Sequence, residues 1–162
     1  LRQCNPSNTM RTLELRVPPP IVAALTATAM WAISQLGPTL SIASSWRLAA
    51  VAALVALGIT CDLLGLLAFR RSRTTINPMK PGKASALVTA GIYKLTRNPM
   101  YLGLVLLLCA WAFYLAAIWP FLGPVLFIAY INRFQIGPEE RIMGAKFGGD
   151  YADYVSRVRR WI

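Results

Sequence analysis

The residues most able to do chemistry lie in two polar clusters, each beside a long apolar run. The first, GIYKLTRNPMYLG, carries Arg97 and Asn98 directly before an apolar segment. The second, GPEERIMGAKFGGDY, carries Glu139 and Glu140 directly after one. Arginine can hold a carboxylate through two parallel hydrogen bonds, and glutamate can accept hydrogen bonds from hydroxyl or ammonium groups. These residue types could therefore bind a small molecule of mixed charge at the mouth of a hydrophobic region.

Other catalytic chemistry is restricted by what the sequence lacks. There is no histidine, and the cysteines, Cys4, Cys61 and Cys109, show no metal-ligand spacing. The commonest general base and the usual zinc ligand are therefore absent, and we expect no metal site. Any reaction must use carboxylates, amides, tyrosines, basic side chains or a cofactor.

The composition is that of a membrane protein. The chain has 162 residues, of which 56% are hydrophobic and 14% charged, and its mean hydropathy is +0.50. This length fits a single domain over 1–162. The net charge of +11 is explained by Lys and Arg in cytoplasmic loops near anionic head groups, so we expect a membrane partner and no nucleic acid.

The hydrophobic pattern predicts an all-α integral membrane protein with about four transmembrane helices. The first two are expected at 21–36 and 46–69, although a signal peptide is an alternative for the first. The apolar run 100–134 is too long for one straight span, and WPFLGP (119–124) is expected to fold it into a helical hairpin. Asp62 lies inside the second segment and should face the protein interior or water, or reach head-group water near the helix end.

The distribution of charge predicts the orientation. The 70–99 loop and the C-terminal tail are strongly basic, whereas the link between the first two spans carries only Arg47, at its end. The positive-inside rule therefore places both termini and the polar clusters in the cytoplasm, in a bacterial inner membrane or an equivalent. Residues 1–17 are expected to be a flexible tail or an addition to the natural chain, with Met10 a candidate natural start.

The C-terminal tail is expected to form amphipathic helices at the cytoplasmic interface. Pro138 fits a first helical position, and Gly148 with Gly149 should end that helix. Asp150 could cap a second helix with an apolar stripe on the membrane surface. The residues of this stripe are Tyr151, Tyr154, Val155, Val158 and Trp161.

The order of these motifs resembles a known family. KASALVTAGIYKLTRNPMYLG followed by EERIMGAKFGGDYADYVSRVRRW is similar to the isoprenylcysteine carboxyl methyltransferase family, whose wider relatives include phospholipid N-methyltransferases. The resemblance covers about 69–161. It implies an integral membrane enzyme that uses S-adenosylmethionine and releases S-adenosylhomocysteine, with 70–162 as the cofactor-binding and catalytic part.

The resemblance also implies a set of site residues. Arg97, Asn98 and Glu140 are expected to be catalytic, with Glu140 able to accept a proton from an amine. Arg97 or Lys83 could hold the cofactor carboxylate, and the glutamates could bind its ribose or ammonium group. The expected cofactor-binding residues are Lys83, Leu87, Val88, Thr89, Gly91, Tyr93, Leu95, Asn98, Pro99, Met100, Tyr101, Glu139 and Glu140. The structural alternatives are a membrane-surface anchor for Arg97, an interfacial belt for the tyrosines and a helix-dipole match for the glutamates.

The expected function is methyl transfer from S-adenosylmethionine to a lipophilic acceptor at the cytoplasmic face. Asn98 stands where the carboxyl methyltransferases have histidine, which leaves open whether the acceptor is a prenylcysteine-like carboxylate, an amine or another lipid head group. The alternatives are a non-catalytic small membrane protein, such as a transporter subunit or assembly factor, and a related membrane reductase. The oligomeric state is not predicted.

Overall fold

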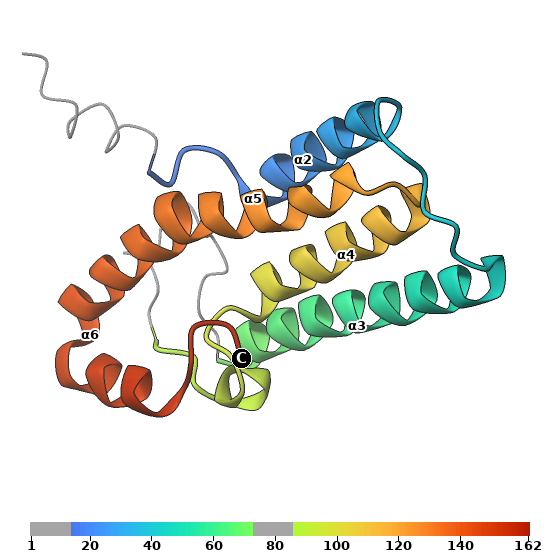
Figure 1. Ribbon diagram of the computed structural model, residues 1–162. Helices are drawn as coiled ribbons and strands as arrows, with labels where there is room; N and C mark the ends of the chain where they lie inside the picture. Colours follow the sequence, from blue (N-terminus) through green and yellow to red (C-terminus); the bar gives the residue numbers. More distant parts are fainter. Residues whose placement is uncertain (1–13, 73–85) are drawn as a thin grey trace, which may run out of the picture.

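The computed structural model describes residues 14–72 and 86–162, and these residues are predominantly helical. The expected all-α class is thus confirmed for the described part of the chain. Figure 1 shows the long helices α2 to α5 side by side, with α6 bent around one end. In chain order the elements are α2 (Pro19–Ser34), α3 (Ser44–Arg71), η2 (Gly91–Lys94), α4 (Pro99–Leu115), η3 (Trp119–Phe121), α5 (Leu122–Ile131), η4 (Asn132–Ile136) and α6 (Gly137–Arg157).

Prolines mark the starts of two helices, as the sequence predicts. Pro19 begins α2 and Pro99 begins α4. A first-turn proline leaves no intrahelical hydrogen bond unmade, because the first N–H groups of a helix have no partner within it. The observed α2 begins and ends two residues before the expected range 21–36.

Glycines let α3 and α4 pack closely along their length. A Cβ atom on Gly58 would lie 3.0 Å from the carbonyl oxygen of Gly103, and one on Gly103 would lie 2.9 Å from that of Gly58. Small residues at such a contact allow two helix backbones to approach each other. On the other side of α4, the side chains of Met30, Leu108, Phe127 and Ile131 form a buried core with α2 and α5.

The helix lengths test the expected count of spans. Among the described helices, only α3, with 28 residues, is long and apolar enough to cross a membrane by itself. The apolar helices α2 and α4 have 16 and 17 residues, so each rises about 25 Å, less than the roughly 30 Å hydrocarbon core. One membrane-spanning helix is therefore supported by length and composition, and the count of four stays a prediction.

The turn between α4 and α5 differs from its predicted position. The chain leaves α4 at Ala116, which has a left-handed φ of 49°, and turns through η3. Gly123 and Pro124 lie in the first turn of α5 instead of in the break. The reason is that proline is tolerated in the first turn of a helix, where its missing N–H costs no hydrogen bond.

The predicted place of Pro138 in the first turn of a helix is confirmed, because α6 begins at Gly137, but this helix is not separated from the one before it. Ile136, the residue before α6, has helical angles (φ −62°, ψ −46°), so the chain continues through the π-helical segment η4 without a break. The wider π turn accommodates a proline that would otherwise interrupt a helix. The predicted break at Gly148 is confirmed, since this residue has φ 51° and ψ −119° inside α6.

Part of the apolar stripe of the tail packs on the protein, whereas the expectation was a stripe on the membrane surface; Val155 is exposed. Helix α6 ends at Arg157, and the side chains of Tyr154 and Val158 are buried. Trp161 packs against the hydrophobic core, and its indole N–H donates a hydrogen bond to Asn132 Oδ1 at 3.1 Å. The kink at Gly148 within α6 and the return of the chain after Arg157 bring these side chains onto the protein.

The last part of the predicted tail 1–17 contacts η4 and α6. The carboxylate of Glu14 forms ion pairs with Arg133 at 3.3 Å and Arg141 at 2.5 Å, and the Leu15 N–H donates to the Phe134 carbonyl. These contacts attach Glu14 and Leu15 to the rest of the protein, and the flexibility of the tail 1–17 stays a prediction. Residues 1–13, including the candidate start Met10, lie outside the described residues.

Candidate cofactor and acceptor site

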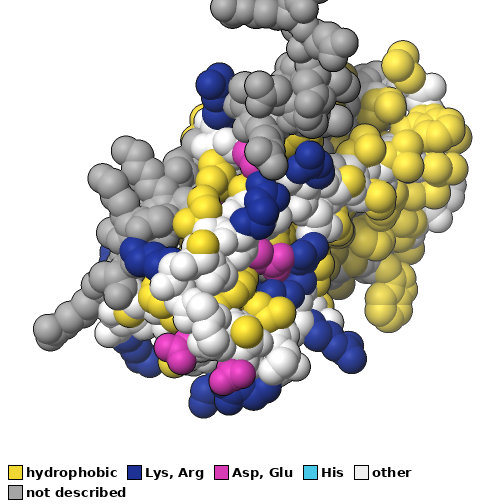
Figure 2. All heavy atoms as spheres, turned by 90° about the vertical axis from the view of Figure 1, so that its left-hand side faces the viewer, with side chains coloured by type: hydrophobic (Ala, Val, Ile, Leu, Met, Phe, Trp, Pro, Cys, Tyr) yellow, Lys and Arg dark blue, Asp and Glu magenta, His cyan; other side chains and the backbone are white. Residues whose placement is uncertain are grey.

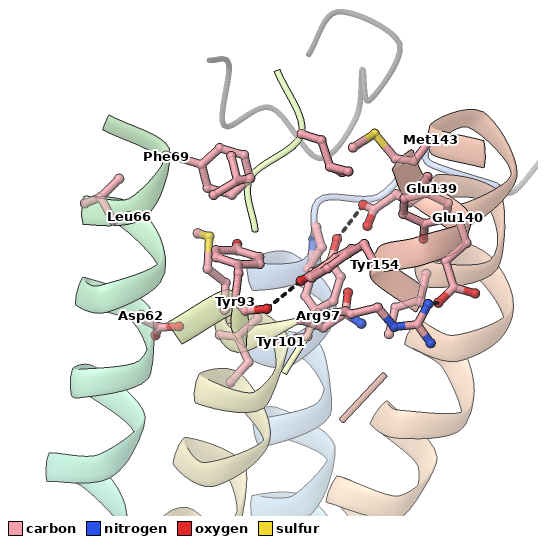
Figure 3. A pocket seen from close by; sticks show the side chains of 18 of the residues that line it. Asp62, Leu66, Phe69, Tyr93, Arg97, Tyr101, Glu139, Glu140, Met143 and Tyr154 are labelled. Atoms are coloured by element: carbon pink, nitrogen blue, oxygen red, sulfur yellow. Dashed lines mark hydrogen bonds and ion pairs between the residues drawn. The ribbon is translucent and has the colours of Figure 1, made fainter. Parts of the chain in front are cut away.

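A cavity of about 490 Å³ lies where α3, α4, α6 and the 86–98 segment meet. Figure 3 shows side chains from these elements pointing into it. Ligand pockets in proteins typically have volumes of roughly 300–1,000 Å³. The lining residues are Pro19, Pro20, Asp62, Leu63, Leu66, Phe69, Ala86, Leu87, Val88, Tyr93, Arg97, Asn98, Met100, Tyr101, Leu104, Ile136, Glu139, Glu140, Met143, Tyr151 and Tyr154.

Two arginines hold Glu140 at the polar end of the cavity. Its Oε1 lies 3.0 Å from Arg97 Nη1, and it accepts hydrogen bonds from Arg160 Nε at 3.1 Å and Arg160 Nη2 at 2.5 Å. Charge-assisted contacts of this kind are about twice as strong as neutral hydrogen bonds. Because both carboxylate oxygens are engaged, the geometry favours a role for Glu140 in positioning Arg97 over the predicted role of proton acceptor.

Glu139 lies in a different environment, although it is the next residue along the chain. The hydroxyl of Tyr101 donates a hydrogen bond to Glu139 Oε1 at 2.5 Å. The pKa of Glu139 is raised to about 7, mainly because the group is buried; the Tyr101 hydrogen bond lowers it, and the nearby charge of Glu140 adds to the rise. This carboxyl group can therefore gain or lose a proton near neutral pH.

Aromatic side chains form the wall beside these carboxylates. Tyr93 lies in η2 and is buried, and its ring meets that of Phe69 edge-on, with centroids 5.5 Å apart. The hydroxyl of Tyr154 donates a hydrogen bond to the backbone carbonyl of Tyr93 at 2.7 Å. Burial raises the pKa of Tyr154, so this group remains a neutral donor. Helix α6 and η2 are thereby joined through the site.

The last residues of the chain form a second link across the site. We call residues 158–162 the C-terminal strap. The Asn98 side-chain amide donates to the Arg160 carbonyl at 2.9 Å, and the Arg97 N–H donates to the Arg159 carbonyl at 3.1 Å. Asn98, directly before α4, is therefore used at least partly to fix the strap.

The opposite side of the cavity is apolar except for one carboxylate. Leu63 and Leu66 on α3 face Met100 and Leu104 on α4, and Asp62 lies among them. In Figure 3 Asp62 lies across the cavity from Glu139 and Glu140. The site thus combines a charged end, an aromatic wall and an apolar side.

Most of the predicted cofactor residues meet at this cavity. Those that line it are Leu87, Val88, Tyr93, Asn98, Met100, Tyr101, Glu139 and Glu140, and Arg97, which was predicted to be catalytic, lines it as well. Thr89, Gly91, Leu95 and Pro99 do not line it, and Leu95 is 75% exposed. Gly91 has a left-handed φ of 63°, so its place in the turn explains the glycine without a ligand. Lys83 lies outside the described residues.

Sequence reasoning missed the contributions of α3, the second half of α6 and the strap. Phe69 and Leu66 lie in α3, and Tyr151 and Tyr154 lie in the second half of α6. Arg160 lies in the strap. The apolar residues carried no signal that distinguishes them from lipid-facing ones. The two tyrosines have a helical spacing, but this spacing predicts a helix on the membrane surface and gives no sign of a pocket.

Charge is concentrated at the end of the molecule that holds the polar part of the site. Figure 2 shows this end, with Lys and Arg side chains around a small group of Asp and Glu side chains. Hydrophobic side chains cover the surface that extends away from it. The large exposed apolar residues of α3 include Trp46, Leu57 and Leu63. Such a surface suits lipid contact, because a bilayer requires apolar side chains on the outside of a protein.

The fold and the site together define a helical membrane protein with a pocket of mixed polarity at its basic end. The family model described as phospholipid methyltransferase matches residues 46–150. This match covers well over half of the chain, and the chain belongs to that family. Membership supports a membrane methyltransferase activity.

A relative of similar sequence is an uncharacterised protein from Haemophilus influenzae. The two chains are 46% identical over 63 residues, which is 39% of this chain and all of the relative. The name of that protein states no activity, so the functional argument rests on the family and on the site.

Proposed function

We propose that the protein transfers a methyl group from S-adenosylmethionine to a lipophilic, membrane-partitioned acceptor at the cytoplasmic face. The observation that carries the proposal is a single cavity with a charged end made by Arg97, Glu139 and Glu140 and an apolar side made by α3 and α4. A water-soluble cofactor suits the charged end, and a bilayer-soluble acceptor suits the apolar side.

The residues present fit the cofactor chemically. Glu139 offers a carboxylate to an ammonium group or to ribose hydroxyls, while Tyr93 and Tyr101 offer aromatic surfaces to an adenine or a sulfonium. The Nε of Arg97 is buried and has no hydrogen-bond partner among residues 14–72 and 86–162. An unpaired buried donor is costly, and a cofactor carboxylate would satisfy it.

When bound, S-adenosylmethionine supplies an electrophilic methyl group on a sulfonium, whose departure as a neutral thioether requires no metal. The protein's own part is to orient the reactants and to exclude water, which can lower the barrier by several kcal/mol. The Arg97–Glu140–Arg160 cluster fixes the charged end. Glu139 has a pKa of about 7 and could take a proton from an amine acceptor, whereas a carboxylate acceptor would need no base.

The orientation follows from the same charges. The basic residues near the polar end include Arg70 and Arg71 at the end of α3 and Arg157 at the end of α6. Under the positive-inside rule, this end lies in the cytoplasm, where the cofactor is available.

Two measurements on the purified protein test the proposal. Isothermal calorimetry should detect binding of S-adenosylmethionine and S-adenosylhomocysteine, and labelled methyl groups should pass to a component of a membrane lipid extract. Glu139→Gln should weaken cofactor binding, while the exposed Asp150→Asn serves as a matched control. Absence of binding in the wild-type chain would refute the proposal.

The transfer assay separates an enzyme from a non-catalytic membrane protein. The latter predicts that Arg97→Ala leaves every measured activity and ligand affinity unchanged. Methyl transfer by the wild type that is lost in Arg97→Ala and retained in the Asp150→Asn control would exclude that alternative.

A further inference from the structure

Gln135 is a buried polar residue that the proposed cofactor chemistry does not use. It lies in the π-helical segment η4, four residues before Glu139, and it is 1% exposed. Pro138 accounts for the π turn, because a proline has no N–H to give to the carbonyl of Phe134. It does not account for an amide side chain at position 135. A polar group buried to this extent normally has a hydrogen-bond partner.

The amide of Gln135 faces the hydroxyl of Tyr101. Within residues 14–72 and 86–162, Gln135 Nε2 has no acceptor at full hydrogen-bond geometry, yet the side chain lies close enough to Tyr101 to act on its hydroxyl as a donor. The Tyr101 proton is already given to Glu139 Oε1, at 2.5 Å. A hydroxyl has one proton and two lone pairs, so the Tyr101 oxygen can still accept the N–H of Gln135. The three side chains therefore form a chain from Gln135 through Tyr101 to Glu139.

Donation to the Tyr101 oxygen would strengthen the hydrogen bond that Tyr101 itself donates. Linked hydrogen bonds polarise one another, and the effect is larger in a buried site than in water. The hydroxyl is also kept from turning, because a proton aimed at Gln135 Nε2 would meet another donor. A stronger hydrogen bond to Glu139 favours its ionised form and opposes the effect of burial. Gln135 thus bears on the charge of Glu139 from outside the cavity.

Other groups around Glu139 also influence its charge. Glu140 disfavours the ionised form, and Glu140 is itself held by Arg97 and Arg160. The titratable and charged side chains that line the same cavity are Asp62 of α3, Tyr93 of η2, Arg97 before α4, Tyr101 of α4, and Glu140, Tyr151 and Tyr154 of α6. A substitution at position 135 leaves all of these residues in place, so it isolates the contribution of the amide.

We infer that Gln135 is a positioning residue, which holds the Tyr101 hydroxyl so that it donates to Glu139 and keeps this carboxylate ready to bind a positively charged group of the cofactor. The inference rests on the proposed function, because it concerns a residue proposed to bind the cofactor. It gives a role to η4, which carries none of the predicted site residues.

The composition of the chain makes Glu139 measurable by itself. The glutamates are Glu14, Glu139 and Glu140, so labelling glutamate with 13C at the side-chain carboxyl gives three NMR signals. The Glu139→Gln variant identifies the signal of Glu139, and its midpoint in the wild type should lie near pH 7. This titration needs no ligand and no enzymatic activity.

The amide of Gln135 can be followed in the same way. The glutamines are Gln3, Gln35 and Gln135, so 15N labelling gives three side-chain amides, and Gln3→Met with Gln35→Met identifies that of Gln135 by elimination. In the otherwise wild-type site, the Gln135 amide signal should move with the midpoint of the Glu139 carboxyl. A Gln135 signal that does not change over this pH range overturns the inference without any substitution at position 135.

Gln135→Met removes the N–H donor at nearly constant size. The midpoint of Glu139 should rise by about 0.5 in pH, and Tyr101→Phe, which removes the whole hydrogen bond, should raise it by about 1 or more. In the Tyr101→Phe background, adding Gln135→Met should cause no further rise, because the inferred effect passes through the hydroxyl. The matched control is Gln35→Met, since Gln35 is exposed at the C-terminal end of α2.

Three results would contradict the inference. An unchanged midpoint in Gln135→Met would show that the amide does not act on Glu139. A lower midpoint would mean that the Gln135 carbonyl competes with Glu139 for the Tyr101 proton. An equal rise in the wild-type and Tyr101→Phe backgrounds would show an effect of packing that does not involve the hydroxyl.

Titration with S-adenosylhomocysteine tests the functional part separately. The pH midpoint of its affinity should move upward in Gln135→Met together with the midpoint of the Glu139 carboxyl, and stay unchanged in Gln35→Met. A shift of the carboxyl midpoint without a shift in the affinity profile would overturn the role in cofactor binding. Absence of S-adenosylhomocysteine binding in the wild type at every pH would contradict the proposed function instead.

Discussion

The side-chain amide of Asn98 donates a hydrogen bond of 2.9 Å to the backbone carbonyl of Arg160, joining residues 62 positions apart. This contact holds the start of α4 against the C-terminal strap. On the same side of the site, Arg160 pairs with Glu140, and Glu140 pairs with Arg97. A residue expected to act on the substrate is thus also part of a structural lock around the charged end.

Two replacements of Asn98 should distinguish the effect of losing its hydrogen-bond donor from the effect of changing its side-chain size. Asn98→Ala removes the hydrogen bond to the strap and should lower stability by about 1 kcal/mol. Asn98→His retains an N–H donor and should restore part of the loss. Thermal unfolding measures the stability of each variant, and titration with S-adenosylhomocysteine measures its cofactor affinity. Equal melting temperatures and equal affinities for Asn98→Ala and Asn98→His would argue against a stabilising hydrogen bond between residue 98 and the strap.

Arg160 is expected to act through Glu140. Arg160→Ala leaves one oxygen of Glu140 without its partner and should weaken cofactor binding by about tenfold, since charge-assisted contacts contribute roughly 1.5–3 kcal/mol. Arg160→Lys should recover part of this loss. The neighbouring Arg159 is exposed, so Arg159→Ala is the matched control. Unchanged affinity in Arg160→Ala would show that Glu140 is positioned by Arg97 alone.

The pH dependence of stability should reveal Glu139. Its pKa is raised from 4.5 to about 7 on folding, so the folded state favours the protonated form. Ionisation therefore costs stability, beginning as pH rises above the unfolded value and reaching its full extent above about 7. The Glu139→Gln variant does not ionise at this position and lacks this cost. The melting temperature of the variant minus that of the wild type should therefore increase as the pH is raised from 4.5 to 8.

Cofactor binding gives a second readout of the same group. If Glu139 binds the ammonium of the cofactor, wild-type affinity should rise with pH through about 7, as the carboxylate becomes ionised. The Glu139→Gln variant should show a flatter profile over this range. A profile that is identical in the two proteins would exclude Glu139 as the titrating group.

The α3–α4 contact should be sensitive to one added methyl group. Gly103→Ala would crowd both Asp62 and the Gly58 carbonyl, and overpacking of this kind typically costs about 1–3 kcal/mol. Gly149→Ala is the control, because a Cβ atom there would meet nothing within 4 Å. A normal melting temperature for Gly103→Ala would show that the two helices separate easily.

Much of the fold can be predicted from local signals. Pro19 and Pro99 mark helix starts, Gly148 marks a break, and the apolar segment around Asp62 predicts α3. These predictions succeed because they depend on backbone chemistry near each residue. The turn at Ala116 was missed because an alanine in a left-handed conformation is stabilised by contacts with the distant Pro38–Leu40 segment.

The sequence by itself determined the class of the protein, the two polar clusters and most of the residues at the charged end of the cavity. Only the tertiary structure decided that Glu140 is held by two arginines, that Glu139 is buried against Tyr101, and that the strap closes on Asn98. It also turned Tyr154, Val158 and Trp161 of the predicted membrane-surface stripe inward. The physical reason is that helix formation and hydropathy are local, whereas burial, pairing and the pKa of a carboxyl group depend on residues brought together from distant parts of the chain.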